Sequence, residues 1–299
     1  MGHPLIAGVD IGGTKTHLVA ARGGVTVTDR ILPTDDWRVR EVDADAAALA
    51  GLVRSLCDGA APASTAVGAH GCDTDAQCTA LRSALGRCLG GTVQVLNDAE
   101  LMAPAAGRFG GIGVVVGTGS IAVARSPDGR MLAAGGWGWI LGDEGSAPAL
   151  VRDAARAVRG AIDRGTPGDA LTDALMRAVG TDDPTALGRR LDATRSAVAW
   201  GRYASAVFAA ADAGSTLAAG VIAGGARALA ELVGVLIGRG ADAASVVAGG
   251  GVIAEQPRLE HAFRAAMTEL SPASDVVVLR DPPVLGALAL AGRALGPAA

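Results

Sequence analysis

An apolar strand, a glycine-rich turn and a second strand occur twice in this 299-residue sequence, and this repetition constrains the fold more than any other feature. The first copy is "GVDIGGTKTHLVAA" at residues 8–21, and the second is "VVVGTGSIAV" at residues 114–123. Apolar runs joined by such turns are typical of hairpins in a sheet. Because the second copy restarts the pattern of the first, it predicts two lobes that begin in the same way.

The rest of the chain alternates between strand-like and helix-like patterns. Expected strands lie at 25–32, 66–70, 93–97 and 275–279, and expected helices at 43–58 and 75–89, across most of 144–241 with breaks near 165–168 and 181–184, and from Pro283. This alternation predicts an α/β fold. We expect an N-terminal lobe at 1–108, a C-terminal lobe at 109–283, and a closing helix at 284–299 that packs back against the N-terminal lobe.

Composition narrows the class of protein. A net charge of −4 argues against a nucleic-acid partner or an anionic membrane surface, because both need clustered positive charge. Half of the residues are hydrophobic but only 3% are aromatic, so the cores must consist of small aliphatic side chains. The N-terminus lacks the pattern of a signal peptide, and the apolar helix around 225–238 is interrupted by Arg227 and Glu231. We therefore expect a cytoplasmic protein with no membrane partner.

The four cysteines lie in one stretch and form no C-x-x-C pair, which argues against a zinc knuckle or a redox dithiol. They are Cys57, Cys72, Cys78 and Cys88. We interpret them as reduced structural thiols, and keep Cys72 with Cys78 as an oxidisable pair.

The first turn places a carboxylate, Asp10, at the tip of an apolar strand. Backbone N–H groups in a Gly-rich turn form an anion site, so Gly12, Gly13 and Thr14 can cradle phosphate oxygens, beside Lys15, the only lysine of the chain. Nucleotide phosphates arrive with Mg²⁺, which needs a carboxylate such as Asp10 nearby. A plain hairpin turn explains the same glycines equally well.

The second turn repeats this pattern with Gly117, Thr118, Gly119 and Ser120. Two such loops, one in each lobe, can hold a triphosphate from both sides. Between them lies "VLNDAELMA", in which Asp98 follows a buried strand and opens a helix. Asp98 is interpreted either as a helix N-cap or as a carboxylate that faces the space between the loops.

Two further stretches contain residues suited to ligands. In "GGWGWILGDEGSA" (135–147), a tryptophan face and the carboxylate of Asp143, placed with Glu144 at an expected helix start, suit a sugar. The alternatives are a helix cap for Asp143 and core packing for the two tryptophans. In "AGGGV" (248–252), Gly249, Gly250 and Gly251 allow the backbone to approach a flat ligand such as adenine, which is a weak signal by itself.

In order, "DIGGTKT", "NDAELMA", "GTGS", "GGWGWILGDEGSA", "AGGGV" and "PPVLGALALA" resemble the N-acetylglucosamine kinases of the BadF/BadG/BcrA/BcrD ATPase family, within the actin-like sugar kinase superfamily. The resemblance covers nearly the whole chain, and "GGWG" followed by "GDEGSA" is its most specific part. It implies two ribonuclease-H-like lobes around a deep cleft, with ATP and Mg²⁺ on one side and an amino sugar on the other. It also implies a homodimer.

By the same resemblance, Asp98 is the catalytic base that takes the proton of the sugar 6-hydroxyl, and Asp10 is the magnesium-associated carboxylate. Nucleotide-binding residues are expected at Gly12, Gly13, Thr14, Lys15, Gly117, Thr118, Gly119, Ser120, Gly249, Gly250 and Gly251. Sugar-binding residues are expected at Asp35, Trp37, Asp98, Gly119, Gly136, Trp137 and Asp143. The implied reaction gives N-acetylglucosamine 6-phosphate and ADP.

Two departures from the family pattern leave the sugar open. "PTDDWRV" has Asp35 and Asp36 next to Trp37 where these kinases carry Asn before the Trp, and Ile121 follows "GTGS" where some relatives carry Asn. Since a carboxylate accepts from hydroxyls and also pairs with an ammonium group, both N-acetylglucosamine and glucosamine fit, and a muramyl sugar also stays open. We favour N-acetylglucosamine.

Three other classes compete with a sugar kinase. A reductase-activating ATPase of the same family needs cysteine ligands after the second loop, and every cysteine here precedes residue 89. A sugar-responsive transcription regulator needs a helix-turn-helix with a basic surface, for which the sequence offers no segment. A non-catalytic sugar-binding protein is disfavoured by Asp98 and the two intact loops.

Overall fold

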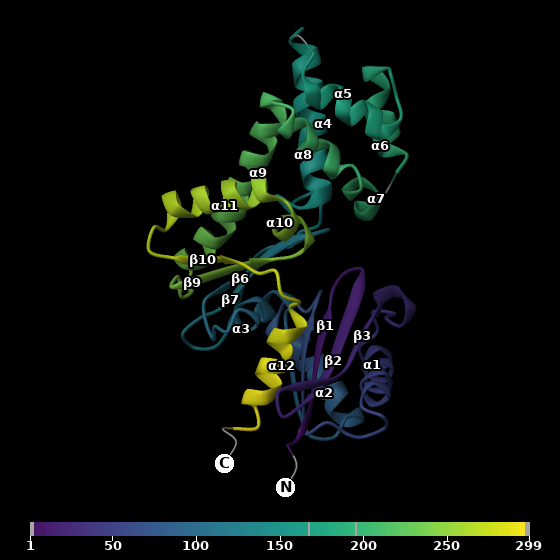
Figure 1. Cartoon of the computed structure of the whole chain (residues 1–299), viewed down its shortest axis with the longest axis vertical. Coiled ribbons are helices and arrows are strands. Elements are labelled where there is room, and N and C mark those ends of the chain that lie inside the picture. The colour runs from purple at the N-terminus through teal and green to yellow at the C-terminus, as the bar shows by residue number, and fades with distance from the viewer. Residues whose placement is uncertain (1–2, 167, 195, 297–299) are drawn as a thin grey trace.

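The computed structural model describes residues 3–166, 168–194 and 196–296, and shows two lobes that each contain a five-stranded sheet (Figure 1). The strand order is β3-β2-β1-β4-β5 in the first sheet and β10-β9-β6-β7-β8 in the second. Each sheet has a central strand, β1 or β6, with an antiparallel hairpin on one side and parallel strands on the other. The prediction of an α/β fold with two lobes that begin alike is confirmed.

The N-terminal lobe contains β1 (Leu5–Ile11), β2 (Lys15–Arg22), β3 (Val25–Pro33), η1 (Thr34–Asp36), α1 (Val42–Leu56), β4 (Ser64–Ala69), α2 (Asp75–Cys88), β5 (Thr92–Leu96), η2 (Asp98–Leu101) and α3 (Met102–Ala105). Its core is aliphatic, as the composition predicts, with Leu18, Leu49 and Leu85 fully buried. Helix α12 (Val284–Arg293) returns to this lobe and packs against β1, β4 and α3. Gly8 permits this close approach, since a Cβ there would lie 2.8 Å from the Leu288 nitrogen.

The second lobe contains β6 (Ile112–Val116), β7 (Ser120–Arg125), β8 (Met131–Gly135), α4 (Ala147–Asp163), α5 (Ala170–Val179), η3 (Pro184–Ala186), α6 (Leu187–Asp192), α7 (Ala197–Gly201), α8 (Ala204–Asp212), α9 (Thr216–Gly238), β9 (Ser245–Gly249), α10 (Gly251–Glu255), α11 (Pro257–Leu270) and β10 (Asp275–Val278). Helices α4 to α8 gather at the end of the molecule remote from both termini (Figure 1). Its hydrophobic core is separate from that of the first lobe.

Helix α9 is long and apolar enough to cross a membrane by length and composition. In the fold it packs against α4, α11, β7 and β8, and Ile222, Leu229 and Val233 are buried in the core of the second lobe. The helix predicted around 225–238 is therefore a core helix of this lobe.

Two expected helix boundaries, the start at Asp143 and the end at residue 299, differ from the structure. The helix expected from Asp143 begins instead at Ala147, with Ser146 as its N-cap. Asp143 has φ +53°, which a helix excludes. Helix α12 ends at Arg293, so the expected helix to 299 is too long, and its last three residues lie outside the described part of the chain. Of the break expected near 165–168, residue 167 also lies outside the described ranges.

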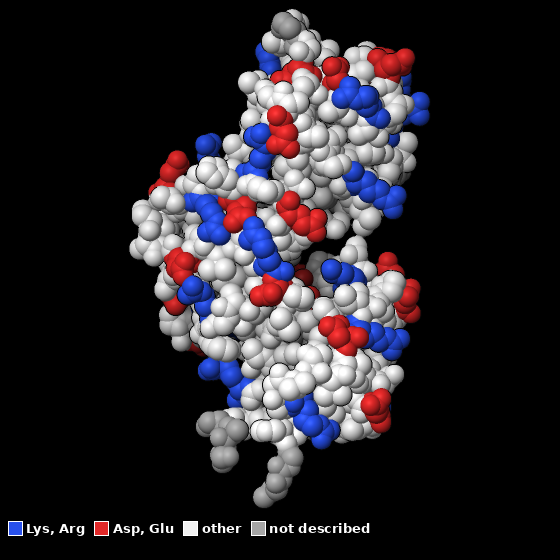
Figure 2. Space-filling model, viewed as in Figure 1, with Lys and Arg blue, Asp and Glu red and all other residues white. Residues whose placement is uncertain are grey.

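The two lobes meet at a short helical segment formed by η2 and α3. Helix η2 packs against β1 and β4 of the first sheet and against β6 and β7 of the second. The molecular surface is hollowed between the lobes (Figure 2). A residue at the start of η2 therefore lies at the junction of both lobes.

Candidate active site

Three neighbouring parallel strands of the first sheet deliver side chains to one edge. Asp10 of β1 pairs in register with Gly68 of β4, and Gly68 pairs with Leu96 of β5. His70 and Asp98 each follow this aligned row by two residues. Ligands of open α/β sheets bind at the carboxyl ends of parallel strands, so Asp10, His70 and Asp98 stand at the expected edge.

Asp98 is the first residue of η2, and its neighbour Asn97 is the N-cap. The Ala99 N–H donates to Asn97 Oδ1 over 2.9 Å, and the Asn97 N–H donates to Glu100 Oε1 over 3.1 Å, which completes a capping box. The interpretation of Asp98 as the cap is therefore wrong. Asp98 is only 7% exposed although its carboxylate is not needed to cap the helix.

Burial shifts the proton affinity of both acidic groups at this edge. It raises the pKa of Asp98 to about 6, with a smaller opposing effect from His70. Burial, together with repulsion from Asp98, raises the pKa of Asp10 to about 7, and Lys15 opposes this rise. A carboxylate with a pKa near 6 is ionised above that pH and is a stronger base than an ordinary aspartate.

The first glycine loop is a hairpin turn that other side chains hold in place. The Gly12 N–H donates to the Lys15 carbonyl over 2.9 Å, and the Thr34 hydroxyl donates to the Gly12 carbonyl over 3.0 Å. Gly13 faces the ring of His70, since a Cβ on Gly13 would lie 3.7 Å from His70 Nε2. The backbone bond from Gly12 to Lys15 is that of a hairpin turn. The position of His70 next to Gly13 places the same turn at the candidate site.

The predicted sugar-binding segment at 35–37 is connected to this loop. Trp37 donates from its indole nitrogen to the Thr16 hydroxyl over 3.0 Å, and the Thr16 and Thr34 hydroxyls are 3.0 Å apart. The Trp37 ring packs against the core of the first lobe. Asp35 and its neighbour Asp36 are exposed on η1.

The second glycine loop lies against the segment that contains Asp143. A Cβ on Gly119 would lie 3.2 Å from Asp143 Oδ2, and the Ser120 hydroxyl donates to the Glu144 carbonyl over 2.8 Å. Asp143 is buried, and this burial raises its pKa. Around Gly117 there is open space, with nothing within 4 Å of a Cβ position. The fold thus joins two motifs that are more than twenty residues apart in the sequence.

The tryptophans of "GGWGWILGDEGSA" have different environments. Trp137 follows Gly136, which has φ +75°, and is 76% exposed, so core packing is the wrong interpretation for this residue. Trp139 packs on Trp200, with ring centroids 4.6 Å apart. Only Trp137 of this pair presents an uncovered face to a ligand.

The glycines at 249–251 are largely explained by packing. A Cβ on Gly249 would lie 2.6 Å from Met102 Sδ, and one on Gly250, which has φ +107°, would lie 2.6 Å from the Val116 carbonyl. Gly251 opens α10 and has free space around it. Their predicted contact with a nucleotide stays a prediction.

His70 is the site residue that the sequence analysis missed. Its Nδ1 lies 4.0 Å from Asp98 Oδ2, and its backbone is held on both sides. Its N–H donates to the Ile11 carbonyl over 2.8 Å, and its carbonyl accepts from Arg38 Nη1 over 2.9 Å. The available signal was a polar residue directly after the buried strand "STAVGA", the same signal that drew attention to Asp10 and Asp98.

Cys72 and Cys78 lie beside the candidate site, whereas Cys57 and Cys88 lie at the ends of α1 and α2, before β4 and β5. All four are free thiols, and Cys57, Cys72 and Cys78 are buried, in agreement with the interpretation as reduced structural thiols. The Cys72 carbonyl accepts from Asn97 Nδ2 over 3.2 Å, and from Cys78 Sγ over 3.6 Å.

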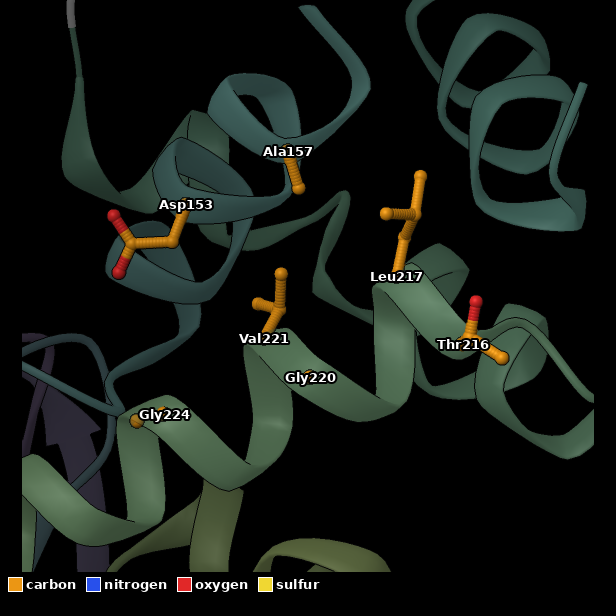
Figure 3. A pocket seen from close by; sticks show the side chains of 8 residues that line it. Asp153, Ala157, Thr216, Leu217, Gly220, Val221 and Gly224 are labelled. Carbon is orange, nitrogen blue, oxygen red and sulfur yellow. The ribbon is translucent and has the colours of Figure 1, made fainter. Parts of the chain in front are cut away.

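A separate groove lies between α4 and α9 (Figure 3). Its lining contains none of the predicted site residues, and Asp153 is its only ionisable side chain. Asp153 is already paired with Arg152 and Arg156. This groove therefore offers no group for catalysis.

Comparison with known proteins supports the resemblance drawn from the motifs. The chain is 49% identical over 57 residues to an N-acetylmuramic acid/N-acetylglucosamine kinase of Clostridium acetobutylicum, which covers 19% of each chain. It is 28% identical over 193 residues to an N-acetyl-D-glucosamine kinase of Dictyostelium discoideum, which covers 59% of this chain and 60% of that protein. The matched regions thus span about a fifth and three fifths of the length of these curated relatives.

Among solved structures, the fold resembles that of a Chromobacterium violaceum protein named "Putative N-acetylglucosamine Kinase". The TM-score is 0.72 at 24% identity, over 96% of this chain and 99% of that one. The model of one protein family, described as the BadF/BadG/BcrA/BcrD ATPase family, matches residues 7–291. Since this match covers nearly the whole chain, the protein belongs to the BadF/BadG/BcrA/BcrD ATPase family.

Proposed function

We propose that the protein is an ATP-dependent amino-sugar kinase that phosphorylates the 6-hydroxyl of N-acetylglucosamine. The observation that carries this proposal is Asp98, a buried carboxylate with a pKa raised to about 6 at the junction of two lobes that each present a glycine loop. The names of the curated relatives support the same class of substrate.

In the proposed reaction the two loops hold the phosphates of ATP and Asp98 is the general base. The sugar O6–Pγ bond forms as the bond from Pγ to the bridging oxygen breaks, and ADP leaves with that electron pair. The hydroxyl proton goes to Asp98, a task for which a positioned carboxylate suffices. Phosphoryl transfer otherwise needs alignment and stabilisation of charge, which backbone N–H groups at Gly12–Thr14 and Gly117–Ser120 would supply.

The residues at the first loop suit a magnesium ion. Asp10 is close enough to Asp98 for its pKa to rise, and a nearby cation relieves such repulsion between buried carboxylates. The described residues contain no group of three or more His, Cys, Asp or Glu side chains arranged for a metal. A single carboxylate is typical for Mg²⁺, which takes its other ligands from phosphates and water. Asp10 would hold this ion, whose positive charge would stabilise the transferred phosphoryl group.

The sugar would lie against Asp143, Gly119, Gly136 and Trp137, with Asp35 and Trp37 on the opposite lobe. The buried carboxylate of Asp143 can accept from two adjacent hydroxyls, and Trp137 offers an uncovered ring. The group that Asp35 binds would distinguish the two amino sugars, N-acetylglucosamine and glucosamine. As a hydroxyl acceptor Asp35 suits N-acetylglucosamine, and as an ion-pair partner it suits glucosamine.

The alternative from another class, a reductase-activating ATPase, is disfavoured by the position of the thiols. All four cysteines belong to the N-terminal half of the chain, and three of them are buried. None of them follows the second glycine loop, where the iron–sulfur ligands of that class are expected.

A homodimer and a cytoplasmic location are further parts of this proposal. Exposed apolar side chains support an interface, because Leu141 is 80% exposed and Val235 is 51% exposed. Sedimentation of wild-type protein and of Val235→Arg tests this. A dimer that the substitution converts to a monomer supports the proposal, whereas a monomeric wild-type chain contradicts it.

The kinase proposal is tested by ADP release with Mg-ATP and a panel of N-acetylglucosamine, glucosamine, N-acetylmuramic acid, glucose and no sugar. We expect N-acetylglucosamine to give the highest kcat/KM. A preference for glucosamine would assign Asp35 or Asp36 to the ammonium group. ADP release that ignores every sugar would favour the ATPase alternative.

A further inference from the structure

The imidazole of His70 lies between Asp98 and the first glycine loop. Its Nδ1 edge faces Asp98 at 4.0 Å, and its Nε2 edge faces Gly13 of the first glycine loop. His70 is also close enough to Asp143 to lower the pKa of that carboxyl. The proposed base and the first phosphate loop therefore flank one side chain, and the charge of that side chain also acts on the proposed sugar carboxylate.

The peptide groups of His70 are held by hydrogen bonds, whereas its ring is not, in the part of the chain that the structure describes. The Ile11 carbonyl and Arg38 hold its peptide groups, and Arg38 is itself anchored by Asp45, with 3.4 Å from Nε to Oδ2. Within the described ranges the ring forms no hydrogen bond, and the side chain is 47% exposed. The His70 ring is thus held at a fixed position in the candidate site while its nitrogens are not used by the described part of the fold. Such a side chain is suited to binding a ligand.

From this geometry we propose that His70 is a catalytic residue, which donates a hydrogen bond from Nε2 to an oxygen of the transferred γ-phosphoryl group. This role rests on the proposed kinase function. A phosphate held by the N–H groups of Gly12–Thr14 would lie next to Nε2, because Nε2 is 3.7 Å from the position that a Cβ on Gly13 would occupy. The hydrogen bond would stabilise charge on the peripheral oxygens as the sugar O6–Pγ bond forms and ADP leaves, while the proton moves from O6 to Asp98.

The role of His70 differs from that of the other histidine near the first hairpin. His17 lies on β2, and its Nε2 is 2.7 Å from Asp29 Oδ1 within the fold. Its ring is therefore occupied by the protein itself. His17→Gln is a matched control that removes an imidazole without changing the proposed site.

The test compares His70→Ala, His70→Gln and His17→Gln by steady-state ADP release with the preferred sugar. We expect His70→Ala to lower kcat about 10²-fold, the loss typical of one preorganised donor in an active site. The KM values for ATP and sugar, and the thermal midpoint, should change little. His70→Gln should recover part of kcat because its amide can still donate, and His17→Gln should resemble the wild type in kcat.

Each other result has a defined meaning. If His70→Ala keeps kcat within about threefold of the wild type, or raises only KM, His70 does not act on the transferred group, and the kinase proposal is unaffected. A lower thermal midpoint in His70→Ala, with equal loss in His70→Gln, would assign a structural role instead. A wild-type chain that phosphorylates no sugar would overturn the kinase proposal and the role of His70 with it.

Discussion

The two lobes share one sheet topology but present different chemistry at the ends of their strands. In the first lobe the parallel strands lead to Asp10, His70 and Asp98, which are all ionisable. In the second lobe the corresponding strands β6 and β9 lead to glycines, Gly117 and Gly249. Repeated topology therefore supplies two similar scaffolds, whereas the residues at the strand ends determine what each lobe contributes.

This contrast predicts that the first lobe supplies the reactive groups and the second supplies mainly backbone donors and Asp143. The two lobes also differ in the number of buried carboxylates. Burial raises the pKa of Asp98 and Asp10 in the first lobe and of Asp143 alone among the predicted site residues of the second, and each such burial is unfavourable for folding. The following experiments test this division of roles.

Removal of the charge of Asp98 should have the largest effect. We expect Asp98→Asn to lower kcat by roughly 10²-fold or more while sugar binding persists, because the amide cannot accept the hydroxyl proton. Steady-state ADP release and calorimetric titration with sugar measure the two effects. The control is Asp128→Asn, an exposed carboxylate on a turn of the second lobe, which should keep normal turnover. Near-normal turnover in Asp98→Asn would remove Asp98 from the role of base.

The same substitution should stabilise the metal-free protein at neutral pH. The pKa of Asp98 is raised from 3.8 to about 6 in the fold, so the folded state binds this proton more tightly, and stability falls as pH rises between these values. Asp98→Asn should raise the free energy of unfolding by about 1–3 kcal/mol at pH 8, and this gain should vanish near pH 4. Urea denaturation in EDTA at both pH values measures it.

Asp128 is the control for this experiment because its pKa is shifted in the opposite direction from that of Asp98. Ser126 and Arg130 lower the pKa of Asp128, so Asp128→Asn should bring no gain in stability at pH 8. A gain of equal size in both variants would reflect net charge rather than the burial of Asp98.

The two glycine loops should respond alike if both bind phosphate. Gly13 and Gly117 have ordinary φ values and room for a methyl group, so Gly13→Ala and Gly117→Ala should leave the thermal midpoint unchanged. Both should raise the KM for ATP about tenfold, since a methyl group keeps phosphate from the N–H groups.

Gly91→Ala is the matched control, since Gly91 belongs to none of the predicted binding sites. It has φ +77° and a Cβ there would meet the Ala63 carbonyl, so this variant should lose about 1–3 kcal/mol of stability without a change in the KM for ATP. An ATP effect in only one of the two loop variants would show that the loops are not equivalent.

The smallest effects are expected at one tryptophan in each lobe. Trp37→Phe removes the hydrogen bond to Thr16. Trp200→Phe removes a hydrogen bond that is shared between the Thr194 carbonyl at 2.7 Å and the Leu191 carbonyl at 3.0 Å. Each should cost about 1 kcal/mol in urea denaturation. Only Trp37→Phe should also raise the KM for sugar, because Trp37 belongs to the proposed sugar-binding segment at 35–37 and Trp200 does not. An equal change of KM in both variants would argue against this assignment.

Several features of the site could be predicted because they depend on local sequence. Polar residues after buried strands marked Asp10 and Asp98, and glycine turns marked the two loops. His70 carried the same signal but belonged to no recognised motif, so it was missed. The sequence left Asp98 open as an N-cap, because both Asp98 and Asn97 suit that position, and only the bonds to Ala99 and Glu100 identify Asn97 as the cap.

The sequence alone determined the α/β class, the two lobes and the family resemblance, because alternating apolar periodicity and glycine turns depend on neighbours along the chain. The tertiary structure decided what lies together. It brought Asp143 against Gly119, and it set Trp137 outside the core while Trp139 packs on Trp200. It also placed His70 between Gly13 and Asp98. These contacts join segments that are distant in sequence, and strand register and lobe packing fix them, which no local pattern encodes.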